Sequence, residues 1–162
     1  MESDKLKIRA KNNAYMLLRQ RPRSEFEIRR RLELKGYDGP VIDGIVEGLK
    51  RTGDIDDAKF AKLWMESRMH SSPVGDVVLR HELKEKGVKD SIIEATMADK
   101  AGSYDEYEVA FSMAVERFER LKKLDRRKAL KRLYDFLMRR GFKYDTVRRI
   151  NEALTKPTTD NR

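Results

Sequence analysis

The residues best suited to chemistry in this sequence are cations, and they are concentrated toward its C-terminal end. Between Arg117 and Arg149 there are fourteen Lys and Arg residues against four Asp and Glu residues, a net charge of +10. The whole chain of 162 residues carries +9, so the remainder is close to neutral, at −1. A basic block of this kind is typical of a surface that binds a polyanion, most often nucleic acid. The alternative is a solvated set of helix faces that has no partner.

Residue types for catalysis or metal binding are sparse by comparison. The sequence has no cysteine, and its two histidines, His70 and His81, are eleven positions apart, farther than a zinc-binding pair on one helix requires. The adjacent carboxylates Asp56 and Asp57 fall at a predicted helix start, where capping is a commoner role than catalysis. No phosphate-binding loop or nucleophile elbow is present. We therefore predict that the protein is not an enzyme and uses no metal or cofactor.

Three glycines show how the elements that position these cations are arranged. Gly36, Gly87 and Gly141 lie 51 and 54 residues apart. A leucine precedes each by four positions, a cation precedes it directly (Lys35, Lys86, Arg140), and an apolar residue follows it. A buried leucine, a cation in the last turn and a glycine are together typical of a helix end. The spacing therefore predicts three repeats, each with a sharp corner between two helices.

Apolar periodicity and capping residues predict nine helices and no strand. Capping boxes are expected at Ser24 with Glu27, at Ser91 with Glu94 and at Ser103 with Glu106, and Asp125 is a candidate N-cap. Gly44 and Gly48 have the spacing of closely packed helices, and Trp64 is expected in the core rather than as an exposed stacking platform. The expected helices span 6–20, 24–35, 40–52, 56–70, 74–86, 90–99, 104–122, 126–140 and 144–154.

These elements predict an all-α fold of three tandem three-helix repeats that form an elongated, curved array. The expected repeats are 1–53, 54–100 and 101–155, with short links near 53–55 and 100–103 and a flexible tail at 156–162. No apolar run approaches the roughly 20 residues that span a bilayer, and the N-terminus resembles no signal peptide. We expect a cytoplasmic monomer.

Three segments resemble the RecX family of RecA regulators. They are RPRSEFEIRRRLELKG (21–36), GDIDDAKFAKLWMESR (53–68) and LRHELKEKGV (79–88), and the similarity runs from about Ala14 to Leu154. The resemblance implies a protein that binds RecA and its nucleoprotein filament on DNA and inhibits RecA ATPase, strand exchange and co-protease activity. It also implies a role in recombination, DNA repair and the SOS response, and contact with single- or double-stranded DNA.

One segment departs from the family pattern. The loop HSSPVGDVV (70–78) has no Lys or Arg, whereas the family is usually richer in glycine and basic residues there. If this loop contacts filament or DNA in other members, the contact is altered in this chain.

Cations spread over all three repeats are the candidate partner-binding residues for the RecA filament or for DNA. The alternative function is a helical DNA-binding module in the third repeat, where Arg140-Gly141-Phe142 and the following helix resemble a helix-turn-helix and Arg148 and Arg149 would enter a groove. The candidates are Arg29, Arg30, Lys35, Lys84, Lys86, Arg127, Lys131, Arg139, Arg140, Arg148 and Arg149.

Overall fold

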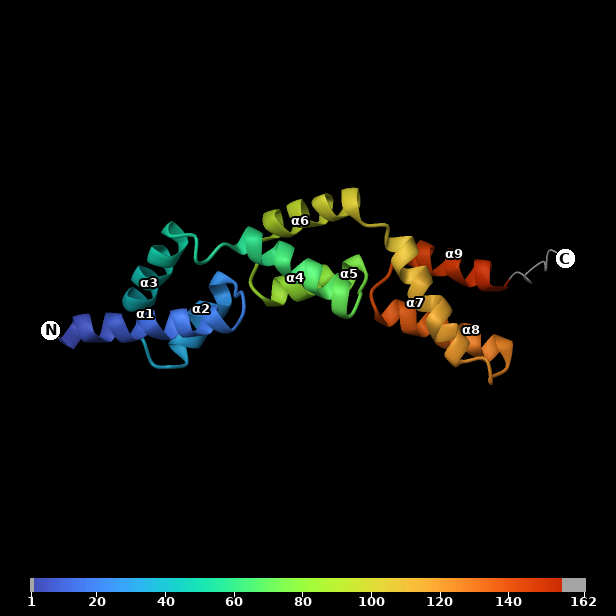
Figure 1. Ribbon diagram of the computed structural model, residues 1–162, viewed down its shortest axis with the longest axis horizontal. Helices are drawn as coiled ribbons and strands as arrows, with labels where there is room; N and C mark the ends of the chain where they lie inside the picture. Colours follow the sequence, from blue (N-terminus) through green and yellow to red (C-terminus); the bar gives the residue numbers. More distant parts are fainter. Residues whose placement is uncertain (1, 156–162) are drawn as a thin grey trace. The chain divides into compact units, whose positions relative to one another are not determined.

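In the computed structural model, which describes residues 2–155, the protein consists of nine α-helices and no strand within that range (Figure 1). This confirms the predicted all-α class. The expected tail at 156–162 lies outside the described residues. The helices are α1 (Glu2–Gln20), α2 (Glu25–Glu33), α3 (Gly39–Arg51), α4 (Asp57–Ser71), α5 (Asp76–Glu85), α6 (Asp90–Ser103), α7 (Glu106–Arg120), α8 (Arg126–Arg139) and α9 (Tyr144–Thr155).

Most helix starts follow from short polar side chains that accept hydrogen bonds from the free N–H groups of the first turn. Ser24 and Glu27 form the expected capping box of α2, and Asp125 caps α8 by accepting from the backbone N–H groups of Arg127 and Lys128. The capping box predicted at Ser103 with Glu106 for the start of α7 is wrong. The N-cap of that helix is Asp105, and α6 remains helical through the expected link at 100–103. The capping box expected at Ser91 is wrong as well, because α6 begins at Asp90 and Ser91 lies inside it.

The three glycine corners share one backbone geometry. Gly36, Gly87 and Gly141 have φ values of 83°, 73° and 78°, in the left-handed region that glycine adopts without strain. In each corner the glycine N–H and the next N–H donate back to carbonyls of the preceding turn, as in a Schellman motif. Gly53, with φ 76°, ends α3 in the same way. The predicted helix stops are therefore confirmed.

The described chain divides into two compact units, which we call the N-terminal unit (2–67 and 82–96) and the C-terminal unit (68–81 and 97–155). The middle helices α4, α5 and α6 each contribute residues to both units. Within the N-terminal unit, α1, α2 and α3 enclose a core of Ala14, Ile28, Leu32, Ile42, Val46, Leu49 and Ile55. Within the C-terminal unit, α7, α8 and α9 enclose a core of Ala110, Ala114, Leu133, Leu137, Phe142, Val147 and Ile150.

The two glycines of α3 do not mark close helix packing, contrary to the expectation from their spacing. A Cβ added at Gly44 or Gly48 would meet no heavy atom within 4 Å among the described residues. Both positions instead border an open hollow beside Lys11 and Tyr15 of α1. The spacing of small residues is therefore a weak signal here, because it carries no information about the neighbouring surface.

Candidate partner-binding surface

The glycine corner of the second repeat is held by the start of α2, within the N-terminal unit. The Ser24 hydroxyl donates a hydrogen bond of 2.6 Å to the carbonyl oxygen of Lys86, and the side chain of Phe26 covers Gly87 so closely that an added Cβ would overlap it. The ammonium of Lys86 lies 3.3 Å from Glu27 and 4.4 Å from the centre of the Trp64 ring. This candidate cation therefore has two partners of its own, and Trp64 is not a free stacking platform.

The glycine corner of the third repeat is held in a similar way within the C-terminal unit. The Gly75 N–H donates to the Arg140 carbonyl oxygen at 2.8 Å, and Gly141 packs against Val78. The Arg140 guanidinium donates to the Ser72 hydroxyl at 2.8 Å and to the Pro73 carbonyl at 3.1 Å. The loop 70–78, which departs from the family pattern, is thus packed against Arg140 and Gly141.

Several other candidate cations form ion pairs with nearby carboxylates. Arg29 is the most strongly engaged, because it bonds both Asp43 and Glu25, and these bonds raise the pKa of its guanidinium further above its ordinary value. The exposed pairs add little to stability, because water screens them. The pairs are Arg29 with Asp43 (2.6 Å), Lys84 with Asp90 (3.1 Å), Lys131 with Asp135 (3.1 Å) and Arg148 with Glu152 (3.6 Å).

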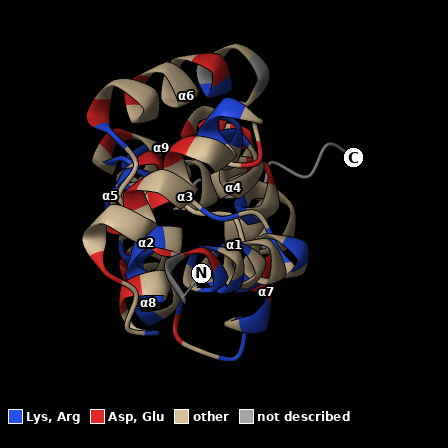
Figure 2. Ribbon diagram, turned by 90° about the vertical axis from the view of Figure 1, so that its left-hand side faces the viewer, with Lys and Arg blue, Asp and Glu red and all other residues tan. Residues whose placement is uncertain are grey.

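Four candidates remain exposed and have no ionic or hydrogen-bond partner for their side chains among the described residues. Arg30 and Lys35 lie in the N-terminal unit, and Arg127 and Arg139 lie on α8. Arg149 is exposed as well, but its guanidinium lies 4.5 Å from the centre of the Tyr107 ring. Figure 2 shows Lys and Arg in blue on helices that also carry Asp and Glu in red, so charge counts alone do not identify the free cations.

Sequence reasoning missed three exposed cations next to its candidates that have no side-chain partner among the described residues. They are Arg31 on α2 and Lys128 and Arg132 on α8. Their only sequence signal is their position beside Arg30, Arg127 and Lys131 on the polar faces of the two helices. With them included, the first turns of α8 carry the denser group of free cations.

The adjacent carboxylates at the start of α4 have structural roles, as expected. Asp56 accepts hydrogen bonds from the backbone N–H groups of Ala58 and Lys59. Asp57 accepts one of 2.8 Å from the backbone N–H of Glu25. Burial raises the pKa of the Asp57 carboxyl above its ordinary value. Both carboxylates are therefore held by backbone groups at helix starts, although Asp56 also borders a cavity of about 440 Å³ in the N-terminal unit.

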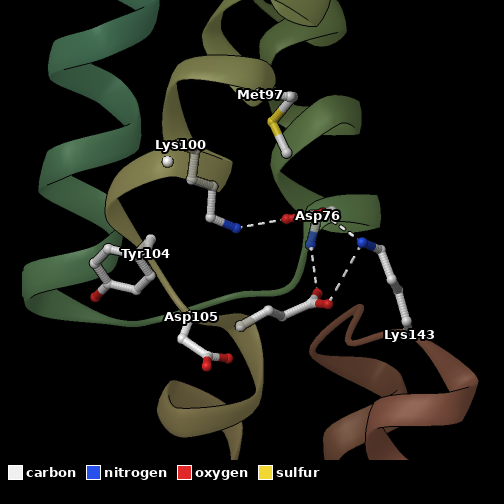
Figure 3. Close-up of a pocket in the computed structure, with 8 residues that line it drawn as sticks. Asp76, Met97, Lys100, Tyr104, Asp105 and Lys143 are labelled. Atoms are coloured by element: carbon white, nitrogen blue, oxygen red, sulfur yellow. Dashed lines mark hydrogen bonds and ion pairs between the residues drawn. The ribbon is translucent and has the colours of Figure 1, made fainter.

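A cavity of about 520 Å³ in the C-terminal unit is lined mostly by charged side chains (Figure 3). The Lys100 ammonium lies 2.5 Å from one carboxylate oxygen of Asp76, and Lys143 lies 3.1 Å from the other and 3.7 Å from Glu106. Burial raises the pKa of Asp76, but the bonds from the two lysines outweigh it, so the net pKa lies below its ordinary value. The two lysines pair with the carboxylates of Asp76 and Glu106, so the network ties helix ends together. Asp105, the N-cap of α7, is a third carboxylate in the lining.

No group of three or more His, Asp or Glu side chains among the described residues is placed to hold a metal ion. No described helix is long and apolar enough to cross a bilayer.

Three family models, each describing one domain, match this chain in order. The first, second and third three-helix domains of RecX match residues 10–49, 56–97 and 104–150. The crystal structure of RecX from Lactobacillus salivarius shares the fold, with a TM-score of 0.80 at 21% sequence identity, over 93% of this chain and 97% of that one. The all-α, three-repeat prediction is therefore confirmed.

Individual relatives agree with the family models. Regulatory protein RecX of Chlorobium phaeobacteroides (strain BS1) is 36% identical over 135 residues, which cover 83% of this chain and 86% of the relative. Regulatory protein RecX of Amycolatopsis mediterranei (strain U-32) is 34% identical over 134 residues, which cover 83% and 76%. The chain belongs to the RecX family of regulatory proteins.

Proposed function

We propose that this chain binds RecA and its nucleoprotein filament on DNA and inhibits RecA ATPase, strand exchange and co-protease activity. The observation that carries the proposal is its membership of the RecX family across all three repeats. The free cations of both units support it, because a filament of protein on DNA presents phosphates and carboxylates to a ligand. Binding is non-covalent and uses exposed cations on several helices.

The structure separates candidates that can be changed without loss of fold from those that cannot. Lys86 and Arg140 hold the repeat corners, so their substitution would confound folding with binding. Arg127 and Arg139 are exposed on α8 and have no side-chain partner among the described residues. They are therefore the residues at which charge reversal tests the proposed surface.

We predict that the wild-type chain inhibits RecA ATP hydrolysis on single-stranded DNA at well below equimolar ratio. The double variant Arg127→Glu/Arg139→Glu should need a roughly tenfold higher concentration for half-inhibition, because two attractive contacts become repulsive. Lys5→Glu/Lys7→Glu on α1 is the matched control. Each reversal removes two charges, so both variants go from +9 to +5. Equal inhibition by both variants would exclude the α8 surface, and no inhibition by wild type would exclude the proposed function.

A second function, direct DNA binding by the third repeat, is favoured by the free cations Arg127, Lys128, Arg132 and Arg139. The helix-turn-helix alternative is less well supported, because Arg148 pairs with Glu152 and Arg149 stacks on Tyr107. Binding through α8 would be driven by phosphate contacts and would show little sequence preference.

We predict that DNA affinity, if carried by α8, falls steeply with salt and needs no RecA. Arg127→Ala/Arg139→Ala should reduce the slope of log affinity against log salt by about two, since each phosphate contact contributes roughly 0.9. Fluorescence anisotropy with a labelled duplex at several NaCl concentrations measures the slope. An unchanged slope, with Lys5→Ala/Lys7→Ala as reference, would place any DNA contact elsewhere.

A further inference from the structure

Two of the three glycine corners are occupied by the start of another helix of the same chain. At the second corner, Ser24 bonds the Lys86 carbonyl and Phe26 covers Gly87. At the third corner, the Gly75 N–H bonds the Arg140 carbonyl. Val78 covers Gly141 there. In both cases a small residue at a helix start donates to the carbonyl before the glycine, and an apolar side chain two or three residues later covers the glycine.

The first corner has the same backbone geometry but no occupant. A Cβ added at Gly36 would meet no heavy atom within 4 Å in the described parts of the chain. No described residue donates a hydrogen bond to the Lys35 carbonyl. The corner lies where α2 turns into the segment before α3, as Figure 1 shows. It therefore presents a free acceptor and an uncovered glycine.

The residue beside this corner differs from its counterparts in the other repeats. Leu34 occupies the position that Glu85 and Arg139 hold in the second and third repeats. Its side chain is 73% exposed, the largest value among the exposed large apolar side chains of the described chain. An exposed leucine next to an unfilled acceptor gives this corner an apolar contact that the charged residues do not offer the other two.

We propose that the open corner Leu34–Gly36 is a docking site for the first turn of a helix on a partner protein. That turn would carry Ser, Thr or Gly as its cap, to donate to the Lys35 carbonyl. An apolar residue would follow, to cover Gly36 and contact Leu34. This inference rests on the proposed function in taking the RecA filament as the partner.

Charge indicates that the docking turn is acidic. At the occupied second corner, Lys86 pairs with Glu27, the carboxylate of the α2 capping box. At the first corner, Lys35 has no side-chain partner among residues 2–155, and within that range Arg30 and Arg31 on the adjacent turns of α2 are also unpaired and exposed. A capping-box Glu or an acidic first turn is common at helix starts, so the required chemistry is an ordinary one.

A second copy of this chain is a poor occupant. In the third repeat, the helix start equivalent to Ser24 and Gly75 is that of α8. Its cap, Asp125, offers a carboxylate that is already bonded to its own helix, and Arg126, Arg127 and Lys128 follow directly. These cations would face Lys35 and Arg30 in a head-to-tail stack, and like charges would oppose it. The geometry therefore favours a foreign, acidic helix start.

The test compares Gly36→Ala with Gly53→Ala in the full chain. Both glycines end a helix with the same motif and similar φ, 83° and 76°, and neither has a neighbour within 4 Å of an added Cβ. The intrinsic strain of the two variants is thus matched, and only Gly36 lies at the proposed site. We expect Gly36→Ala to weaken binding to RecA filaments on single-stranded DNA at least tenfold, because its Cβ would occupy the position of the docked side chain. Gly53→Ala should bind like wild type.

A second pair of variants tests the chemistry of the occupant. Leu34 is exposed, so Leu34→Glu and Leu34→Arg should fold normally. Leu34→Glu should weaken filament binding more than Leu34→Arg, since the docking turn is acidic. Equal binding by wild type, Gly36→Ala and both Leu34 variants would overturn the inference while leaving the proposed function intact.

Two other results would also decide the matter. Absence of any filament binding by the wild-type chain would overturn both the proposed function and this inference. A self-association detected by sedimentation velocity and removed by Gly36→Ala, with filament binding unchanged, would identify a second copy as the occupant and overturn the acidic partner.

Discussion

Replacing Gly75 with alanine is expected to lower the free energy of unfolding of the C-terminal unit by about 3 kcal/mol or more. Gly75 is buried, and its N–H donates to the Arg140 carbonyl at 2.8 Å. An added Cβ would overlap the carbonyl group of Gly141 and the backbone nitrogen of Phe142. Backbone atoms cannot rotate away as a side-chain end can, so the two segments must separate and the hydrogen bond between them is lost.

Gly44→Ala is the matched control for this substitution. Gly44 lies inside α3, where an added Cβ has open space, so alanine should raise stability by roughly 0.5–1 kcal/mol through its better helix propensity. Urea unfolding followed by circular dichroism measures both effects. Because Gly75→Ala should lower the free energy of unfolding and Gly44→Ala should raise it, the two substitutions are distinguished by the direction of the change. If Gly75→Ala were as stable as wild type, the contact between the loop 70–78 and the third glycine corner would be wrong.

The corners themselves were predictable because their causes are local. A leucine, a cation and a glycine within five residues are sufficient to end a helix, and the occurrence of this sequence pattern three times predicts the repeat. The error at α7 is local too. Ser103 and Asp105 compete as caps two residues apart, and Asp105 prevails because its carboxylate accepts from two backbone N–H groups, at 2.8 and 3.4 Å.

What fills each corner could not be predicted, because the partners are far apart in the sequence. Ser24 meets Lys86 across 62 positions, and Arg140 meets Ser72 across 68. The local sequence marks Arg140 as the cation before the glycine, but it does not show that Arg140 bonds the loop 70–78 while Arg139 stays exposed. Charge counting therefore identified a basic C-terminal block correctly but could not separate cations that hold the fold from cations that are free.

The charged cavity of the C-terminal unit could not be predicted from the local sequence either. Its charged members come from α5, α6, the link before α7, the start of α7 and the turn before α9, and each looks like an ordinary surface residue in the sequence. In the sequence, Asp76 belongs to the loop 70–78, whose only notable feature is that it has no Lys or Arg. The structure instead places it between Lys100 and Lys143, where the buried ammonium of Lys100, 4% exposed, needs a carboxylate.

Asp76→Asn is expected to destabilise the C-terminal unit by about 3 kcal/mol at pH 7, because it removes the carboxylate that lies 2.5 Å from a buried ammonium. Asp135→Asn is the control, since Asp135 pairs with Lys131 on the exposed face of α8 and should cost less than about 1 kcal/mol. Both changes remove one negative charge from the same unit. A difference between them therefore reports burial and not net charge.

The pH dependence of this effect gives the stricter test. Burial raises the pKa of Asp76, but the two lysines lower it by more, so its pKa in the folded chain lies below the unfolded value of about 3.9. The stability that Asp76 contributes is therefore fully present above that unfolded value, and it is lost as the pH falls through the lower folded pKa. Urea unfolding of wild type and Asp76→Asn from pH 7 to pH 2 should show a constant gap down to about pH 5 that closes below about pH 4. A gap that stays the same at pH 7 and pH 2 would mean that Asp76 stabilises the fold by its shape and hydrogen bonds, and that its charge contributes nothing.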